Sequence, residues 1–216
     1  MYEHLDTLLE KAKKKLRTEF NRLGSLGFDE LNVVNTKKVT KELFGRLLSD
    51  NEKMYQKVAD KAYSKAKAKA QEVGYGEDIK KKTLSSEWLV DALAAYNFVT
   101  GYVYAREAER KMLRMNEQIL TSREYGSREL YNDSLRKTAN LWWTQTAQYG
   151  IAVVDKAALQ AYKDMGVKKV RWKSVIDGRE CKVCRERDNK IYETSKVPEK
   201  THYRCRCYLE PVKTEE

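Results

Sequence analysis

Side chains that bind soft metal ions gather near the C-terminal end of this 216-residue chain. All four cysteines lie there, as Cys181-x-x-Cys184 and Cys205-x-Cys207, and so does His202, one of only two histidines. The turn of a Cys-x-x-Cys pair directs both thiolates to one point, and His202-x-x-Cys205 offers a second pair. Zn²⁺ takes four such ligands in a tetrahedron, and a shell filled by protein ligands is typical of a structural site. The spacing therefore predicts a structural zinc site.

Five candidate ligands compete for the four positions of that site. We expect Cys181, Cys184, His202 and Cys205 to bind the ion. Cys207 is the alternative to His202, because Cys205 and Cys207 would share one face of an extended segment. Metal-free reduced thiols and disulfides are the other states that four cysteines can adopt. We expect no signal peptide and therefore a reducing cytosol, which favours metal binding over disulfides.

The residues around these ligands follow a fixed order: Trp172, Asp177, Arg179, Cys181-x-x-Cys184, Asp188-Asn189-Lys190-Ile191-Tyr192, Pro198 and His202-x-x-Cys205-Arg206-Cys207. This order resembles the C-terminal signature of phage minor head proteins, the Mu F-like head morphogenesis family. The resemblance covers residues 140–212, a third of the chain, and the N-terminal part carries no motif of its own.

Three positions depart from the family pattern. The stretch Trp143-Thr144-Gln145-Thr146 stands where many members have Arg-Thr-Glu, so any role that depends on that Arg and Glu is absent here. Asn189 replaces the usual Gly, and Asn tolerates the left-handed backbone of a turn. Tyr203 replaces a common Pro. None of these changes alters an expected metal ligand.

What the resemblance implies is a minor capsid protein that acts in head assembly. Such a protein is present in a few copies inside the immature head, held near the portal protein by contacts with it and with other head proteins. Some members of the family contact packaged DNA or leave with it on ejection. We therefore expect this chain in the host cytoplasm during assembly and in the virion interior afterwards.

The net charge of +11 is unevenly distributed. Residues 1–82 carry +6, residues 83–166 carry zero and residues 167–216 carry +5. Basic ends favour a polyanion such as double-stranded DNA, bound through its backbone without sequence preference. The candidate DNA or partner contacts are Arg179, Arg185, Arg187, Arg204, Arg206, Lys65, Lys67 and Lys69. A solvated basic surface explains the same charges without any partner.

Groups suited to catalysis are scarce in this sequence. His4 is expected to be exposed near the start, and His202 is assigned to the metal. The sequence has no His-x-Glu ahead of the Cys pair, no Gly-rich phosphate loop and no Gly-x-Ser-x-Gly. We therefore expect no enzyme, no catalytic residue and no small-molecule substrate.

A zinc-containing regulator that binds nucleic acid is the alternative function. Such a protein would place a recognition helix between its two ligand pairs. The stretch 185–201 is short and strand-prone, and it contains Pro198, which disfavours that helix.

Apolar periodicity predicts a mainly α fold, with an elongated N-terminal helical region followed by a small zinc-stapled α+β C-terminal lobe. Proline is absent before Pro198, so long helices can form. The spacing of apolar residues predicts one helix over 5–23 that ends at Gly24, and a second from a Thr36 cap to about residue 70, continuous or restarted at Asp50. It predicts a third over 85–120, and a fourth over 127–165 that can bend at Gly150.

The pattern changes after Gly166, where β-type residues and turn signals predict short strands near Val170, at Lys190–Tyr192 and at Arg204–Leu209. Charge and periodicity together predict three parts: basic N-terminal helices over 1–82, a central long-helix core over 83–166 and a zinc-binding lobe over 167–216. The last part is too small to bury a sizeable core, so metal ligation would replace the missing burial. We expect no membrane span, because Asp91 and Asn97 interrupt the most apolar stretch, Leu89 to Ala105.

Overall fold

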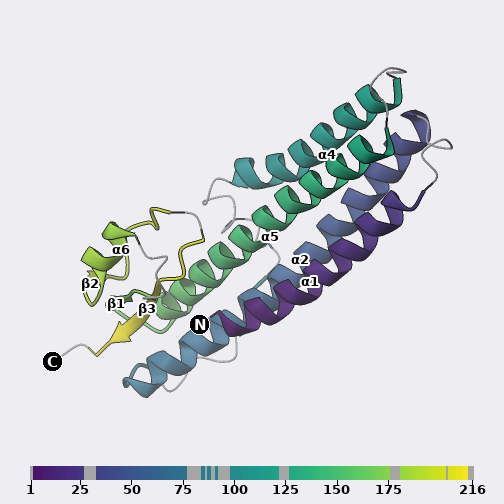
Figure 1. Ribbon diagram of the computed structural model, residues 1–216. Helices are drawn as coiled ribbons and strands as arrows, with labels where there is room; N and C mark the ends of the chain where they lie inside the picture. The colour runs from purple at the N-terminus through teal and green to yellow at the C-terminus, as the bar shows by residue number, and fades with distance from the viewer. Residues whose placement is uncertain are drawn as a thin grey trace. The chain divides into compact units, whose positions relative to one another are not determined.

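The chain is mainly helical, with a small sheet near its C-terminal end (Figure 1). The computed structural model describes residues 2–26, 33–76, 84–85, 87–88, 91, 98–121, 127–175, 181–202 and 204–213, without the side chains of 33–34 and 98–108. Its elements are α1 (Glu3–Gly24), α2 (Val33–Glu72), α4 (Phe98–Thr121), α5 (Arg128–Asp164), β1 (Lys169–Lys173), α6 (Lys182–Arg187), β2 (Ile191–Glu193) and β3 (Tyr208–Val212). The predicted fold class is confirmed: a mainly α chain with a small C-terminal sheet and a cysteine cluster beside it.

The helices follow the apolar periodicity with one correction. α1 and α5 have the predicted extents, but α2 is one continuous helix of 40 residues that neither starts at a Thr36 cap nor restarts at Asp50. Thr36 lies inside its first turn, with a buried hydroxyl. The helix that we predicted over 85–120 is described in part, as α4 and as helical residues at 87–88 and 91.

The chain divides into two compact units. Unit 1 contains Met1–Asp6, Tyr55–Tyr96 and Gln148–Glu216, and unit 2 contains Thr7–Met54 and Asn97–Ala147. Helices α1, α2 and α5 each contribute residues to both units. These boundaries differ from 82 and 166, and the three-part division by charge and periodicity stays a prediction.

Unit 2 has a core built from all four of its helical segments. Phe44 of α2 meets Trp142 of α5 edge to face, with ring centroids 5.1 Å apart. The neighbouring Trp143 packs against the same core, under the ammonium group of Lys13. The buried residues of this core are Leu16, Phe20, Leu23, Leu43, Phe44, Leu47, Met112, Tyr131, Leu135 and Trp142.

In unit 1, small residues allow α2 and α5 to lie side by side. The alanines of the Lys-Ala repeat in α2, Ala62, Ala66 and Ala70, are buried. Tyr63 of α2 donates to Asp164 of α5 over 2.7 Å, which fixes the pairing of the two helices. The buried alanines, at steps of four residues, therefore lie on one side of α2.

The sheet has the order β2-β1-β3 and is antiparallel throughout. Alternation along β1 buries Val170 and Trp172 on one face. The last strand runs over 208–212 instead of the predicted 204–209, because Arg204 has a left-handed φ of 56°. A strand cannot continue through that backbone conformation.

Within the described residues, none of the helices combines the length and the apolar character needed to cross a membrane. The stretch Leu89 to Ala105, for which we predicted a core helix, has no described side chain except that of Asp91.

Two helical glycines, Gly150 in unit 1 and Gly45 in unit 2, give a matched test of packing at Gly150. A Cβ at Gly150 would lie 2.4 Å from Cδ1 of the buried Leu5, whereas a Cβ at Gly45 would meet no atom within 4 Å. Gly150→Ala should lower the free energy of unfolding by about 1–3 kcal/mol, because it overpacks a buried contact. Gly45→Ala should raise it by about 0.5–1 kcal/mol through helix propensity. Urea denaturation measures both, and equal effects would contradict the packing at Gly150.

Candidate metal centre

The candidate centre begins at the N-terminus of α6, which Cys181 caps. Its backbone is extended, with φ −84° and ψ 165°, and its Sγ accepts a hydrogen bond of 3.4 Å from the amide of Cys184. A side-chain acceptor at the N-cap satisfies an amide that the helix leaves free. This bond is the main reason why the pKa of Cys181 is lowered, and Thr201 adds to the effect. The local backbone therefore favours the thiolate form, which is the form that binds metal.

The second ligand pair approaches Cys184 at distances close to those in a coordination shell. Sγ of Cys184 lies 3.2 Å from Nε2 of His202 and 3.6 Å from Sγ of Cys205. In a zinc tetrahedron with bonds of about 2.3 Å to sulfur and about 2.0 Å to nitrogen, neighbouring ligands are separated by about 3.5–3.8 Å. The contacts of Cys184 thus match the edges of such a tetrahedron to within a few tenths of an ångström.

Two overlapping groups of donor atoms could hold a metal ion. Cys181, Cys184 and His202 form one, Cys184, Cys205 and Cys207 form the other, and within each group all donor atoms lie within 4.8 Å of one another. Cys184 belongs to both groups, so the structure brings all five predicted candidates to one thiol. The choice between His202 and Cys207 stays a prediction.

Three of the thiols are buried together. Cys184, Cys205 and Cys207 are each no more than 2% exposed, and they pack against Trp172. Burial raises the pKa of Cys184 to about 11. The hydrogen bond between Cys205 and Cys207 raises the pKa of Cys205 and lowers that of Cys207. Buried thiols of this kind cannot all ionise on their own, whereas a bound divalent cation deprotonates the thiols that coordinate it.

Other residues of the signature hold the centre in place. Ser174 donates through its hydroxyl to the carbonyl of Cys184 over 2.6 Å, and its own amide donates to Asp188 over 2.7 Å. Asn189 has φ 60°, which confirms the left-handed turn expected there. Trp172, which covers the cysteines, carries the guanidinium of Arg187 5.2 Å above its ring. Asp177, Arg179 and Tyr203 lie outside the described residues.

Sequence reasoning missed a polar cluster beside the cysteines, formed by Tyr2, Asp155 and Lys200. The hydroxyl of Tyr2 lies 2.5 Å from Oδ1 of Asp155 and 3.0 Å from the carbonyl of Cys207. Nζ of Lys200 donates to that hydroxyl over 2.7 Å and to the carbonyl of Cys205 over 3.0 Å, and it forms an ion pair of 2.6 Å with Asp155. Burial raises the pKa of Asp155, and Lys200 opposes that rise.

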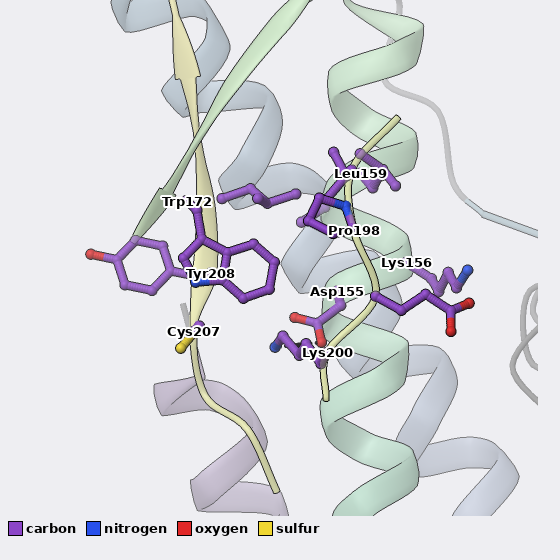
Figure 2. Close-up of a pocket in the computed structure, with 12 residues that line it drawn as sticks. Asp155, Lys156, Leu159, Trp172, Pro198, Lys200, Cys207 and Tyr208 are labelled. Atoms are coloured by element: carbon purple, nitrogen blue, oxygen red, sulfur yellow. Dashed lines mark ion pairs between the residues drawn. The ribbon is translucent and has the colours of Figure 1, made fainter. Parts of the chain in front are cut away.

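A small pocket of about 90 Å³ lies beside this cluster. Figure 2 shows Asp155 and Lys200 facing each other along one side of it, with Trp172 and Cys207 on the strand side. Leu159 and Pro198 give it apolar walls.

The basic residues proposed as DNA or partner contacts differ in exposure. Arg187 covers Trp172, Arg206 pairs with Asp6, Lys65 pairs with Glu3 and Lys69 pairs with Glu210. Arg185 and Arg204 are exposed, Lys67 is half-buried and Arg179 lies outside the described residues. Among the described candidates, Arg185 and Arg204 are therefore the exposed arginines near the candidate centre.

Comparison with known proteins gives no relative: no family model matches the chain, and neither a curated protein nor a solved structure matches it.

Replacing Cys184 tests whether it is the shared ligand. Because it belongs to both donor groups, Cys184→Ser should abolish metal binding, measured by elemental analysis of the purified, reduced protein. Cys207→Ser and His202→Ala, compared directly, identify the fourth ligand, because the variant that keeps full occupancy has lost a non-ligand. Full occupancy in Cys184→Ser would contradict the arrangement.

Proposed function

We propose that the cysteine cluster is a structural zinc site. Thiolates together with one imidazole suit Zn²⁺, and the short distances from Cys184 suit a tetrahedron. With four protein ligands no position is left for water or substrate, so the ion would supply folding energy and no reaction. This agrees with our expectation that the chain has no catalytic residue.

The observation that carries this proposal is the convergence on Cys184 of ligands far along the chain. His202 and Cys205 follow Cys184 by 18 and 21 residues, across β2 and the loop that contains Pro198. A metal at this point would join α6 to the segment before β3. The strands are only 5, 3 and 5 residues long, so the lobe has little other burial to stabilise it.

We further propose that the chain is a minor head protein of a phage, packaged in the virion near the portal protein. What supports this is the sequence order given above, together with the places of several of its described residues around the candidate centre. Trp172 covers the cysteines, Asp188 binds the amide of Ser174 and Asn189 makes the expected turn.

The alternative, a regulator that binds nucleic acid, has less support. Residues 185–201, all of which the structure describes, contain the end of α6 and the strand β2. They contain no helix long enough to read a DNA groove. Contact with DNA would therefore be through the phosphate backbone.

Mass spectrometry of purified virions tests the head-protein proposal. We expect the protein at low copy number in the particle, and we expect it to co-purify with the portal protein from assembling heads. Absence from both virions and assembling heads would contradict the proposal.

Exposed arginines near the centre test DNA contact. Binding to duplex DNA should weaken with salt, and each phosphate contact should add about −0.9 to the log–log slope. Arg185→Gln with Arg204→Gln should make that slope shallower by about 2 without loss of zinc, since neither side chain is a candidate ligand. The matched control is Arg136→Gln with Lys137→Gln, two exposed cations that pair with Asp133. If the slope is unchanged in Arg185→Gln with Arg204→Gln, or if the parent does not bind DNA at about 50 mM salt, the two arginines form only a solvated surface.

A further inference from the structure

Three of the five candidate ligands lie on residues 200–207, here called the ligand segment. This segment is irregular: β3 begins only at Tyr208, and Arg204 has a left-handed φ of 56°. Its backbone is therefore not fixed by strand pairing. Something else must hold the carbonyl groups and side chains of Cys205 and Cys207 where the metal needs them.

Tyr2, which precedes α1, Asp155 of α5 and Lys200 of the segment itself supply that support. The carbonyls of Cys205 and Cys207 each receive a hydrogen bond, from Nζ of Lys200 and from the hydroxyl of Tyr2, both over 3.0 Å. Asp155 of α5 holds both donors, at 2.6 Å from Nζ of Lys200 and 2.5 Å from the hydroxyl of Tyr2 (Figure 2 shows Asp155 and Lys200). We call Tyr2, Asp155 and Lys200 the clasp.

The residues between the ligands continue the same pattern. Arg204 donates its amide to the side chain of Gln148 in α5 over 2.7 Å. Arg206 pairs with Asp6 of α1 over 2.5 Å, and its guanidinium lies 5.1 Å from the ring centre of Tyr2. The amide of Arg204 and the side chain of Arg206 thus contact α5 and α1, while the carbonyl of Cys207 contacts Tyr2, just ahead of α1.

Burial makes these contacts hard to replace. Tyr2 is 4% exposed, and the side chain of Lys200 is 11% exposed. Removing the hydroxyl of Tyr2 would take one donor from the carbonyl of Cys207 and one from Asp155. Groups that orient metal ligands in this way typically change metal affinity by 10–100-fold when they are removed.

We propose that Tyr2 is a positioning residue of the metal centre, which acts through the clasp on the backbone of Cys205 and Cys207. The coupling is reciprocal: metal binding fixes the ligand segment, and the ligand segment in turn fixes the turn that opens α1. This inference rests on the proposed zinc site. It adds that residues from the opposite end of the sequence belong to the support of that site.

The zinc affinity of the full-length protein, measured by competition with a chromophoric zinc chelator, tests whether Tyr2 positions the ligands. Tyr2→Phe should weaken zinc binding about 10-fold or more. The matched control is Tyr162→Phe, which removes an equally buried hydroxyl that donates over 3.0 Å to the carbonyl of Leu209, a residue that is not a ligand. The zinc affinity of Tyr162→Phe should stay within about twofold of that of the parent, because its hydroxyl binds the backbone of a residue that is not a ligand.

Amide hydrogen exchange of the parent protein tests whether metal binding stabilises the start of α1. This experiment does not depend on the folding of any variant. Removing zinc with a chelator should speed amide exchange at residues 3–9, at the start of α1, and leave residues 39–48 of α2 unchanged. Equal zinc affinity of Tyr2→Phe and the parent, or exchange at residues 3–9 that ignores zinc, would overturn the clasp and leave the zinc site standing. A parent that binds no zinc would overturn both.

Discussion

The structure of the C-terminal lobe depends on one electrostatic constraint: three thiols, Cys184, Cys205 and Cys207, are buried together under Trp172. Burial raises the pKa of Cys184, and the hydrogen bond between Cys205 and Cys207 raises the pKa of Cys205 and lowers that of Cys207, so the three thiols do not ionise together without a partner charge. A divalent cation would remove this conflict, because thiolates that ligate it are stabilised by its charge. The proposed metal would also stabilise a lobe whose strands are short.

The helices show how far apolar periodicity determines a fold. Gly24 and Gly166 mark the ends of α1 and α5 in the sequence, and the alanines of the Lys-Ala repeat indicate close packing that the structure confirms. The continuity of α2 could not be predicted, because Asp favours an N-cap over a helix interior and α2 nevertheless continues through Asp50. Tertiary packing decides between them. In the same way, nothing in the sequence of Trp142 and Trp143 indicates that both contribute to one core.

The candidate centre was predictable in its ligands and not in its support. Cys-x-x-Cys and His-x-x-Cys spacings reflect local turns, so the sequence predicts Cys181, Cys184, His202 and Cys205, with Cys207 as the alternative ligand. The structure places these five residues in two overlapping donor groups, and which four bind stays a prediction. The final strand was misplaced because the backbone of Arg204 is left-handed, which a short apolar alternation cannot reveal. The pairing of Tyr2 with Asp155 joins residues 153 positions apart, and no local pattern encodes such a contact.

The central claim is that one zinc ion joins the two ligand pairs at Cys184. X-ray absorption at the zinc edge, recorded on purified protein, tests it most directly. The account predicts a four-coordinate first shell of three sulfurs at about 2.3 Å with one nitrogen at about 2.0–2.1 Å, or four sulfurs if Cys207 replaces His202. A first shell without sulfur, or protein that is fully folded and free of zinc, would contradict it.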